Sequence, residues 1–239
     1  MSDRMLPMAN TDVSGSDAEP VATGGPDGTS AIRLVGTLAV AGALAGLAIV
    51  LVFQWANPQI EAYRAEVLAN AVTEVLAGAD RYETVFVEEG TLTAAPAADT
   101  ADLDRVYVGF GAGDLPVGVA IQGGEPGFQD VISLIFGFDP ASGTLTGMKV
   151  LEHKETPGLG DKIERDSAFI RAFEGARSPL LGVKQARASG AAQEVVMITG
   201  ATISSRAIVD IINHRLAELE GPVREYWSSL DRQSPGGSR

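Results

Sequence analysis

The sequence predicts an α+β protein in which an N-terminal transmembrane helix precedes a single domain with an antiparallel sheet and flanking helices. Leu34 to Phe53 is a run of twenty residues without a charge. Between residues 106 and 151, four segments of strand composition follow one another with turn residues between them. Helical patterns lie before and after these segments. A chain of 239 residues has room for one medium-sized domain with appendages.

The apolar run predicts an uncleaved membrane anchor over residues 31–56. About twenty residues span a hydrocarbon core of about 30 Å as a helix. A cleaved signal peptide is the alternative, but its apolar region is shorter and lies closer to the N-terminus, behind basic residues. Arg33 and Arg64 are the nearest basic residues on the two sides, so charge alone does not decide the orientation. Residues 1–30 are rich in Gly, Ser, Asp, Pro and Thr and predict a disordered acidic tail.

The domain is expected over residues 57–225. Asn57 and Pro58 are predicted to cap and start an amphipathic helix that ends near Gly78. Tyr82 to Val87 predicts a strand, and residues 90–102 predict a loop. A meander of about four antiparallel strands is expected next, over Val106 to Phe110, Val117 to Ile121, Val131 to Phe138 and Thr144 to Leu151.

The second half of the domain is predicted to alternate loops with short elements. A polar loop over residues 152–162 precedes a short helix around Phe169 to Phe173. Residues 176–193 are expected at the surface, and Glu194 to Ile198 forms a last short strand. The final helix is expected over Ile203 to Leu219, with a polar tail over residues 226–239. Its buried side is assigned to Ile203, Ala207, Val209, Ile211, Ile212, Leu216 and Leu219.

Composition excludes several classes of function. The formal net charge is -13 and no Lys/Arg-rich run occurs, which argues against nucleic-acid binding. There is no cysteine, so disulfides, thiolate metal sites and cysteine-ligated iron–sulfur clusters are excluded. With only two histidines, His153 and His214, no metal site is predicted. A redox role would therefore depend on an organic cofactor.

One candidate site is Met197 to Ser205, where an apolar run turns into the last helical pattern. Small residues let a ligand approach the backbone, and the free N–H groups of a helix N-terminus suit a phosphate. Hydroxyl groups at such a place can hydrogen-bond that phosphate or be esterified by it. Taken alone, the segment is equally typical of a Ser/Thr cap after a tight turn.

The second candidate site is the loop Glu152 to Lys162. Gly158 and Gly160 permit close approach of the backbone to a planar ligand, and Pro157 fixes the direction of the chain. His153, Glu155 and Thr156 are the polar groups that would orient such a ligand. An ordinary turn with a surface histidine is the alternative interpretation.

Together these segments resemble a known family. Residues 152–163 (EHKETPGLGDKI) look like the signature loop of the RnfG family, the FMN-binding subunits of the Rnf ion-translocating electron transport complex. Residues 199–205 (TGATISS) look like the flavin attachment motif of that family, which the related NqrC subunits of the sodium-translocating NADH:quinone reductase share. The resemblance covers roughly residues 34–219, and the two motifs occur in the family's order.

The resemblance implies a covalent FMN, joined by a phosphoester to Thr202 by a flavin transferase that uses FAD, which makes the chain a phosphoprotein in the chemical sense. It also implies that Thr199, Gly200, Ala201 and Ser204 line the phosphate. Glu155, Thr156, Pro157, Gly158, Leu159 and Gly160, with His153, would flank the rest of the flavin. One departure is that Val196 stands where the family usually has an aspartate, and Glu194 is displaced by two positions onto the same strand face.

By resemblance, the chain is a redox subunit of an ion-translocating complex that links ferredoxin and NAD, rather than an independent enzyme. Its partners would be the other membrane subunits, and its domain would face the periplasm or cell exterior. Two alternatives are a stand-alone covalent-flavin relay for another periplasmic reductase and a non-redox, membrane-tethered ligand-binding domain. A hydrolase is disfavoured, since no Gly-x-Ser-x-Gly elbow is present.

Overall fold

The computed structural model describes residues 28–97, 99–100 and 103–233. The expected acidic tail therefore lies outside the described residues, apart from its last three, which are helical. The chain divides into two compact units, Met1–Pro58 and Gln59–Arg239.

Helix α1 (Gly28–Val75) contains the predicted anchor. Its apolar part is fully exposed and is long and apolar enough to cross a membrane. The expectation of a new helix at Asn57 and Pro58 is wrong, because Pro58 lies inside α1. A proline inside a helix removes one hydrogen bond, at a cost of about 3 kcal/mol, but no stop signal accompanies it in the helical patterns on either side.

The second unit is built around a six-stranded antiparallel sheet in the order β2-β1-β3-β4-β5-β6. The predicted meander is confirmed as its last four strands. The strands are β1 (Arg81–Glu88), β2 (Thr91–Thr93), β3 (Asp104–Phe110), β4 (Pro116–Pro126), β5 (Val131–Asp139) and β6 (Thr144–Glu152). Strand β2 falls in the predicted loop, where Glu89 and Gly90 both adopt positive φ and form the two-residue turn of a β1–β2 hairpin.

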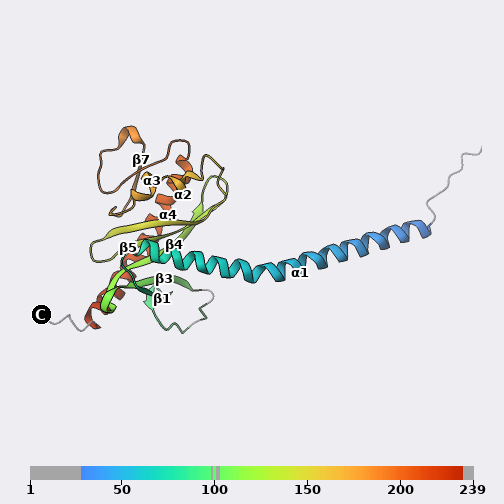
Figure 1. Ribbon diagram of the computed structural model, residues 1–239, viewed down its shortest axis with the longest axis horizontal. Coiled ribbons are helices and arrows are strands. Elements are labelled where there is room, and N and C mark those ends of the chain that lie inside the picture. The colour runs from blue at the N-terminus through green and yellow to red at the C-terminus, as the bar shows by residue number, and fades with distance from the viewer. Residues whose placement is uncertain (1–27, 98, 101–102, 234–239) are drawn as a thin grey trace, which may run out of the picture. The chain divides into compact units, whose positions relative to one another are not determined.

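Both faces of the sheet are buried within this unit. Successive strand residues alternate between two apolar clusters, as Val106 and Tyr107 illustrate. One cluster contains the buried side of helix α4 (Thr202–Gln233), and the other contains Ala71, Val72 and Val75 at the end of α1. Figure 1 shows this end of α1 beside β4 and β5.

Short elements connect the sheet to α4. Helices α2 (Lys162–Arg165) and α3 (Ser167–Arg171) occupy the region of the predicted short helix. The region expected at the surface contains β7 (Leu181–Val183), which pairs in parallel with β8 (Glu194–Val196), and its Leu180 is buried. Two short 3₁₀ turns, Ala112–Asp114 and Gln185–Arg187, complete the described elements.

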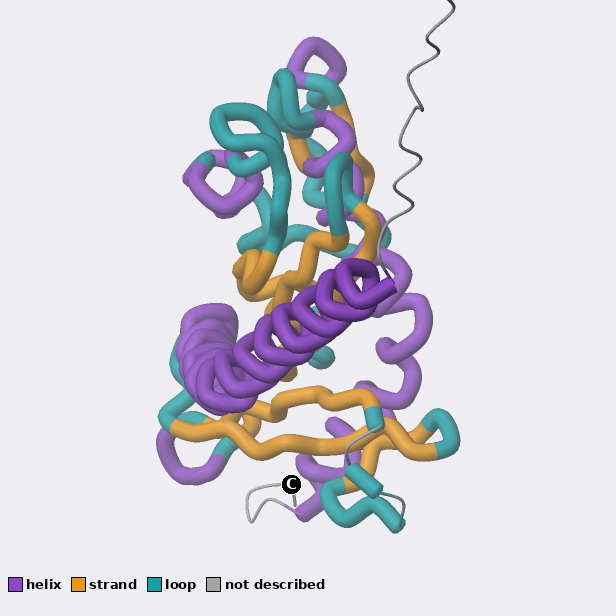
Figure 2. The backbone as a smooth tube through the Cα atoms, turned by 90° about the vertical axis from the view of Figure 1, so that its right-hand side faces the viewer, coloured by secondary structure: helices purple, strands orange, loops and turns teal. Residues whose placement is uncertain are grey.

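Helix α4 is longer than the sequence pattern indicated. It continues past Leu219 through Pro222 to Gln233, and Trp227 is only 9% exposed. At its other end Ile203 is 54% exposed, so its assignment to the buried side is wrong. Figure 2 shows the helices and strands along the backbone of the same chain.

Candidate flavin site

The two motifs converge on one cavity. It has a volume of about 310 Å³ and is lined by Phe128, Glu155, Thr156, Leu159, Gly160, Gly200, Ala201, Thr202, Ile203 and Ser204. Three loops supply these residues: the β4–β5 connection, the segment after β6, and the turn between β8 and α4. The expected convergence of residues 152–162 with 197–205 is therefore present in the structure.

Each motif forms the same kind of turn beside the cavity. Leu159 donates its N–H to the carbonyl of Thr156, and Ala201 donates to the carbonyl of Ile198, at 3.1 and 3.0 Å. The third residue of each turn is a glycine in the left-handed region, Gly158 at φ 78° and Gly200 at φ 87°. This arrangement matches a type II turn, for which glycine is preferred at that position.

The two turns also contact each other. A Cβ built on Gly200 would lie 3.7 Å from Cδ2 of Leu159, an ordinary van der Waals distance. Pro157, Gly158 and Thr199 form the turns and do not line the cavity, although each was predicted to flank the ligand.

Thr202 is the first residue of α4 and lines the cavity. The first bond of the helix runs from the N–H of Ser205 to the carbonyl of Ala201 at 2.8 Å. The N–H groups of Thr202, Ile203 and Ser204 precede that bond, and no described protein group accepts from them. Such N–H groups, together with the positive end of a 32-residue helix, favour a bound phosphate.

The hydroxyl groups of Ser204 and Ser205 have partners inside the protein. Ser204 Oγ donates to Glu155 Oε2 at 2.5 Å, so its hydroxyl joins the two motifs instead of being the additional phosphate donor that was expected. Ser205 Oγ accepts from the N–H of Ile198 at 3.2 Å and ties the end of the strand to the helix. Both residues are buried.

His153 does not reach the cavity. Its Nδ1 accepts from the N–H of Glu155 at 3.1 Å, and its Nε2 lies 3.1 Å from Glu164 Oε2. A ring whose Nδ1 accepts carries its hydrogen on Nε2, which then donates to Glu164. His153 therefore supports the loop, and its predicted role as a ligand-contacting group is wrong.

Two cavity residues were missed by sequence reasoning, Phe128 and Ile203. Phe128 is 64% exposed and comes from the β4–β5 connection, which carries no recognisable motif. Ile203 lies inside the second motif, where it was assigned to the core. Their exposure beside a cavity was the informative property, and it requires the fold to be known.

Glu194 does not replace the aspartate that the family usually has. Its carboxylate accepts from the N–H groups of Ser189 and Gly190 and from Ser189 Oγ, at 2.7 to 3.0 Å. These hydrogen bonds, that from the Ser189 hydroxyl first, lower the pKa of Glu194. Glu194 thus fixes its own loop, while Val196 is half-buried on the same strand.

The cavity, the helix start and the loop that faces it define an FMN-binding domain, and comparison with known proteins agrees. Residues 127–217 match the family described as "FMN-binding domain". The G subunit of the ion-translocating oxidoreductase complex of Escherichia coli K12 is 34% identical over 155 residues, covering 63% of this chain and 73% of that protein. The chain belongs to this family of G subunits, the RnfG family.

Other proteins support the same assignment. The G subunit of the corresponding complex of Methanosarcina acetivorans is 28% identical over 190 residues, covering 78% of this chain and 93% of that protein. The crystal structure of Shewanella oneidensis NqrC has the same fold, with a TM-score of 0.58 over 70% of this chain and 99% of that one, at 17% identity. The N-terminal apolar helix agrees with the membrane complexes to which the relatives belong.

Proposed function

We propose that this protein is a membrane-anchored electron-transfer subunit that carries FMN in phosphoester linkage to Thr202. The observation that carries the proposal is the position of Thr202, at the first turn of α4 and in the wall of the cavity that both motifs form. When bound, FMN supplies the redox chemistry, and the protein supplies its position and electrostatic surroundings.

The residues around the cavity fit this group. The N–H groups of Thr202, Ile203 and Ser204 are available to phosphate oxygens, and the exposed side chains of Phe128 and Leu159 offer apolar surface to a planar ring. Attachment joins Thr202 Oγ1 to the phosphorus of FMN and releases AMP from FAD, the donor used by the flavin transferase. No acid–base group of this chain is needed for that step.

The partners and location follow from the same proposal. Its relatives are subunits of ion-translocating oxidoreductase complexes. We propose that this chain acts in an Rnf-type complex between ferredoxin and NAD, with its domain on the periplasmic or extracellular side of the cytoplasmic membrane. A stand-alone flavin relay would contain the same covalent FMN but would purify without other membrane subunits.

Replacement of Thr202 tests the attachment. Thr202→Ala removes the only hydroxyl of the motif that both lines the cavity and has no partner among the described residues, so covalent flavin should be lost completely. Thr199→Ala is the matched control, because Thr199 lies outside the cavity. Intact-mass measurement after co-expression with a flavin transferase reads out both variants, and melting curves verify folding. Retention of the flavin mass in Thr202→Ala would contradict the proposal.

A further inference from the structure

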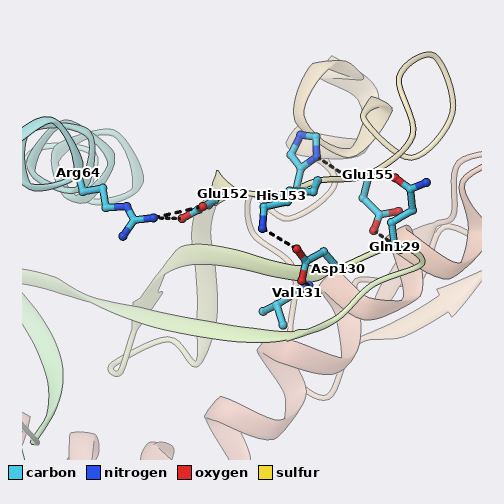
Figure 3. A network of polar contacts seen from close by, with 8 residues as sticks. Arg64, Gln129, Asp130, Val131, Glu152, His153 and Glu155 are labelled. Carbon is cyan, nitrogen blue, oxygen red and sulfur yellow. Dashed lines mark hydrogen bonds and ion pairs between the residues drawn. The ribbon is translucent and has the colours of Figure 1, made fainter. Parts of the chain in front are cut away.

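The carboxylate of Glu155 is buried in the wall of the cavity and fully hydrogen-bonded. The residue is 4% exposed. Its Oε2 accepts from Ser204 Oγ at 2.5 Å, and its Oε1 accepts from the N–H groups of Phe128 and Gln129 at 2.9 and 3.1 Å. Figure 3 shows Glu155 beside Gln129.

Glu155 is ionised in this environment. Burial raises the pKa of the carboxyl group, but the Ser204 hydroxyl and the N–H groups of Gln129 and Phe128 lower it by more. The net result is a pKa below the ordinary glutamate value, and the wall of the cavity therefore carries a negative charge at neutral pH.

Two glycines pack around this charge. A Cβ on Gly127 would lie 2.5 Å from Oε1, and a Cβ on Gly160 would lie 2.5 Å from Oε2. No Lys or Arg among the described residues forms an ion pair with Glu155. A buried charge with no counter-ion is weakly screened, so its field extends into the adjoining cavity.

We propose that Glu155 is a positioning residue that joins the two motifs and whose fixed negative charge lowers the reduction potential of the flavin on Thr202. This inference rests on the function proposed above. An electron added beside a fixed negative charge is disfavoured, so the flavin becomes a stronger reductant. The same carboxylate, through Ser204, fixes the first turn of the helix that carries Thr202.

Two variants separate the charge of Glu155 from its structural contacts. Glu155→Gln removes the charge and keeps the size of the side chain. Ser204→Ala keeps the charge but removes one of the donors that stabilise it. With the full-length flavinylated protein, spectroelectrochemical titration at neutral pH should show a shift to more positive midpoint potential in Glu155→Gln. The potential of Ser204→Ala should stay unchanged or move to more negative values.

A nearby exposed carboxylate provides the control. Glu152 lies three residues away, is solvent-exposed and pairs with Arg64 at 3.3 Å. Glu152→Gln should leave the midpoint potential unchanged, because solvent screens an exposed charge. The melting temperature of each flavin-free variant reports the structural contribution separately.

An unchanged potential in Glu155→Gln, or a positive shift shared by Glu155→Gln and Ser204→Ala, would overturn the inference, since simple loosening of the site moves both variants alike. If Glu155→Gln gives no cooperative melting transition, Ser204→Ala decides, and a positive shift in it contradicts the proposal. Wild-type protein that carries no flavin would refute the proposed function, and this inference with it. Normal flavin content with unmoved potentials refutes this inference alone.

Discussion

At the scale of single residues, the polar run 152–155 joins four separate parts of the fold. The partners are Arg64 for Glu152, Glu164 for His153, Asp130 for Lys154, and Ser204 for Glu155. Figure 3 shows Arg64, Glu152, Asp130 and Glu155 in this network. The exposed ion pairs are each worth about 0–1 kcal/mol. Buried Glu155 is therefore the contact on which the loop depends most.

The close packing of Gly160 gives a prediction at this scale. A Cβ at this position would meet Glu155 Oε2 at 2.5 Å, Glu155 Cβ at 2.8 Å and Ser204 Oγ at 3.0 Å. Gly160→Ala should thus lower the free energy of unfolding by about 1–3 kcal/mol, as overpacked sites do. Denaturant unfolding measures the loss.

Gly124 in β4 is the control for Gly160. A Cβ there would meet no atom closer than 3.4 Å, so Gly124→Ala should have a much smaller effect on stability. Equal stability of Gly160→Ala and the wild type would show that the contact between Gly160 and the Glu155–Ser204 pair is not tight.

At the scale of elements, α4 connects the cavity to the sheet along its whole length. It begins at the cavity with Thr202 and packs on β4 and β5 through residues such as Ile208 and Ile211. Close to its middle, His214 Nδ1 lies 2.5 Å from Glu125 Oε1 of β4. The position of α4 on the sheet therefore includes a titratable contact.

The pH dependence of this contact has a definite sign. The hydrogen bond and charge of Glu125 raise the pKa of His214 above its ordinary value. The stabilisation is fully present below the unfolded pKa, about 6.5, and is lost as the pH rises through the folded pKa. Glu125→Gln should therefore lower the melting temperature more at about pH 5.5 than at about pH 8.5. The same difference at both pH values would contradict this role, and His214→Gln should abolish the pH dependence.

Long patterned elements were predictable from the sequence, whereas short or interrupted ones were not. The apolar run of α1 and the alternation of β3 to β6 predicted those elements because many residues report the same period. Strands β2 and β7 have three residues each and depend on partners that the fold supplies. The extension of α4 was missed, although Val223, Tyr226, Trp227 and Leu230 continue its apolar spacing beyond Pro222.

The site followed the same division. Thr202, Ala201, Glu155 and Leu159 were placed correctly at the cavity because two motifs identified their loops. The roles within the loops were harder to assign. Nothing in the order of residues distinguishes Ser204, whose hydroxyl bonds Glu155, from a donor to phosphate, because that depends on which carboxylate lies opposite.

At the scale of the whole molecule, helix α1 combines two kinds of surface. Its N-terminal part is apolar and exposed, as a lipid-facing segment requires, while Ala71 to Leu76 pack against the sheet of the second unit. The chain therefore pairs a membrane segment with a folded domain. This organisation fits a protein that exchanges electrons at a membrane surface.

The side of the membrane occupied by the domain can be tested directly. We expect protease added to cells with a permeabilised outer membrane, but an intact cytoplasmic membrane, to digest the C-terminal domain. A cytoplasmic marker protein should stay intact under the same conditions. Protection of the domain until the cytoplasmic membrane is lysed would place it on the cytoplasmic side and contradict the proposed location.

The covalent flavin on Thr202 is the central claim, and peptide-level mass spectrometry tests it most directly. The protein is isolated from membranes of cells that contain the flavin transferase, digested, and its peptides fragmented. We expect the peptide containing Thr199 to Ser205 to carry one FMN-phosphoryl group, with fragment ions that place it on Thr202. An unmodified peptide, or a flavin on Thr199, Ser204 or Ser205, would contradict the account.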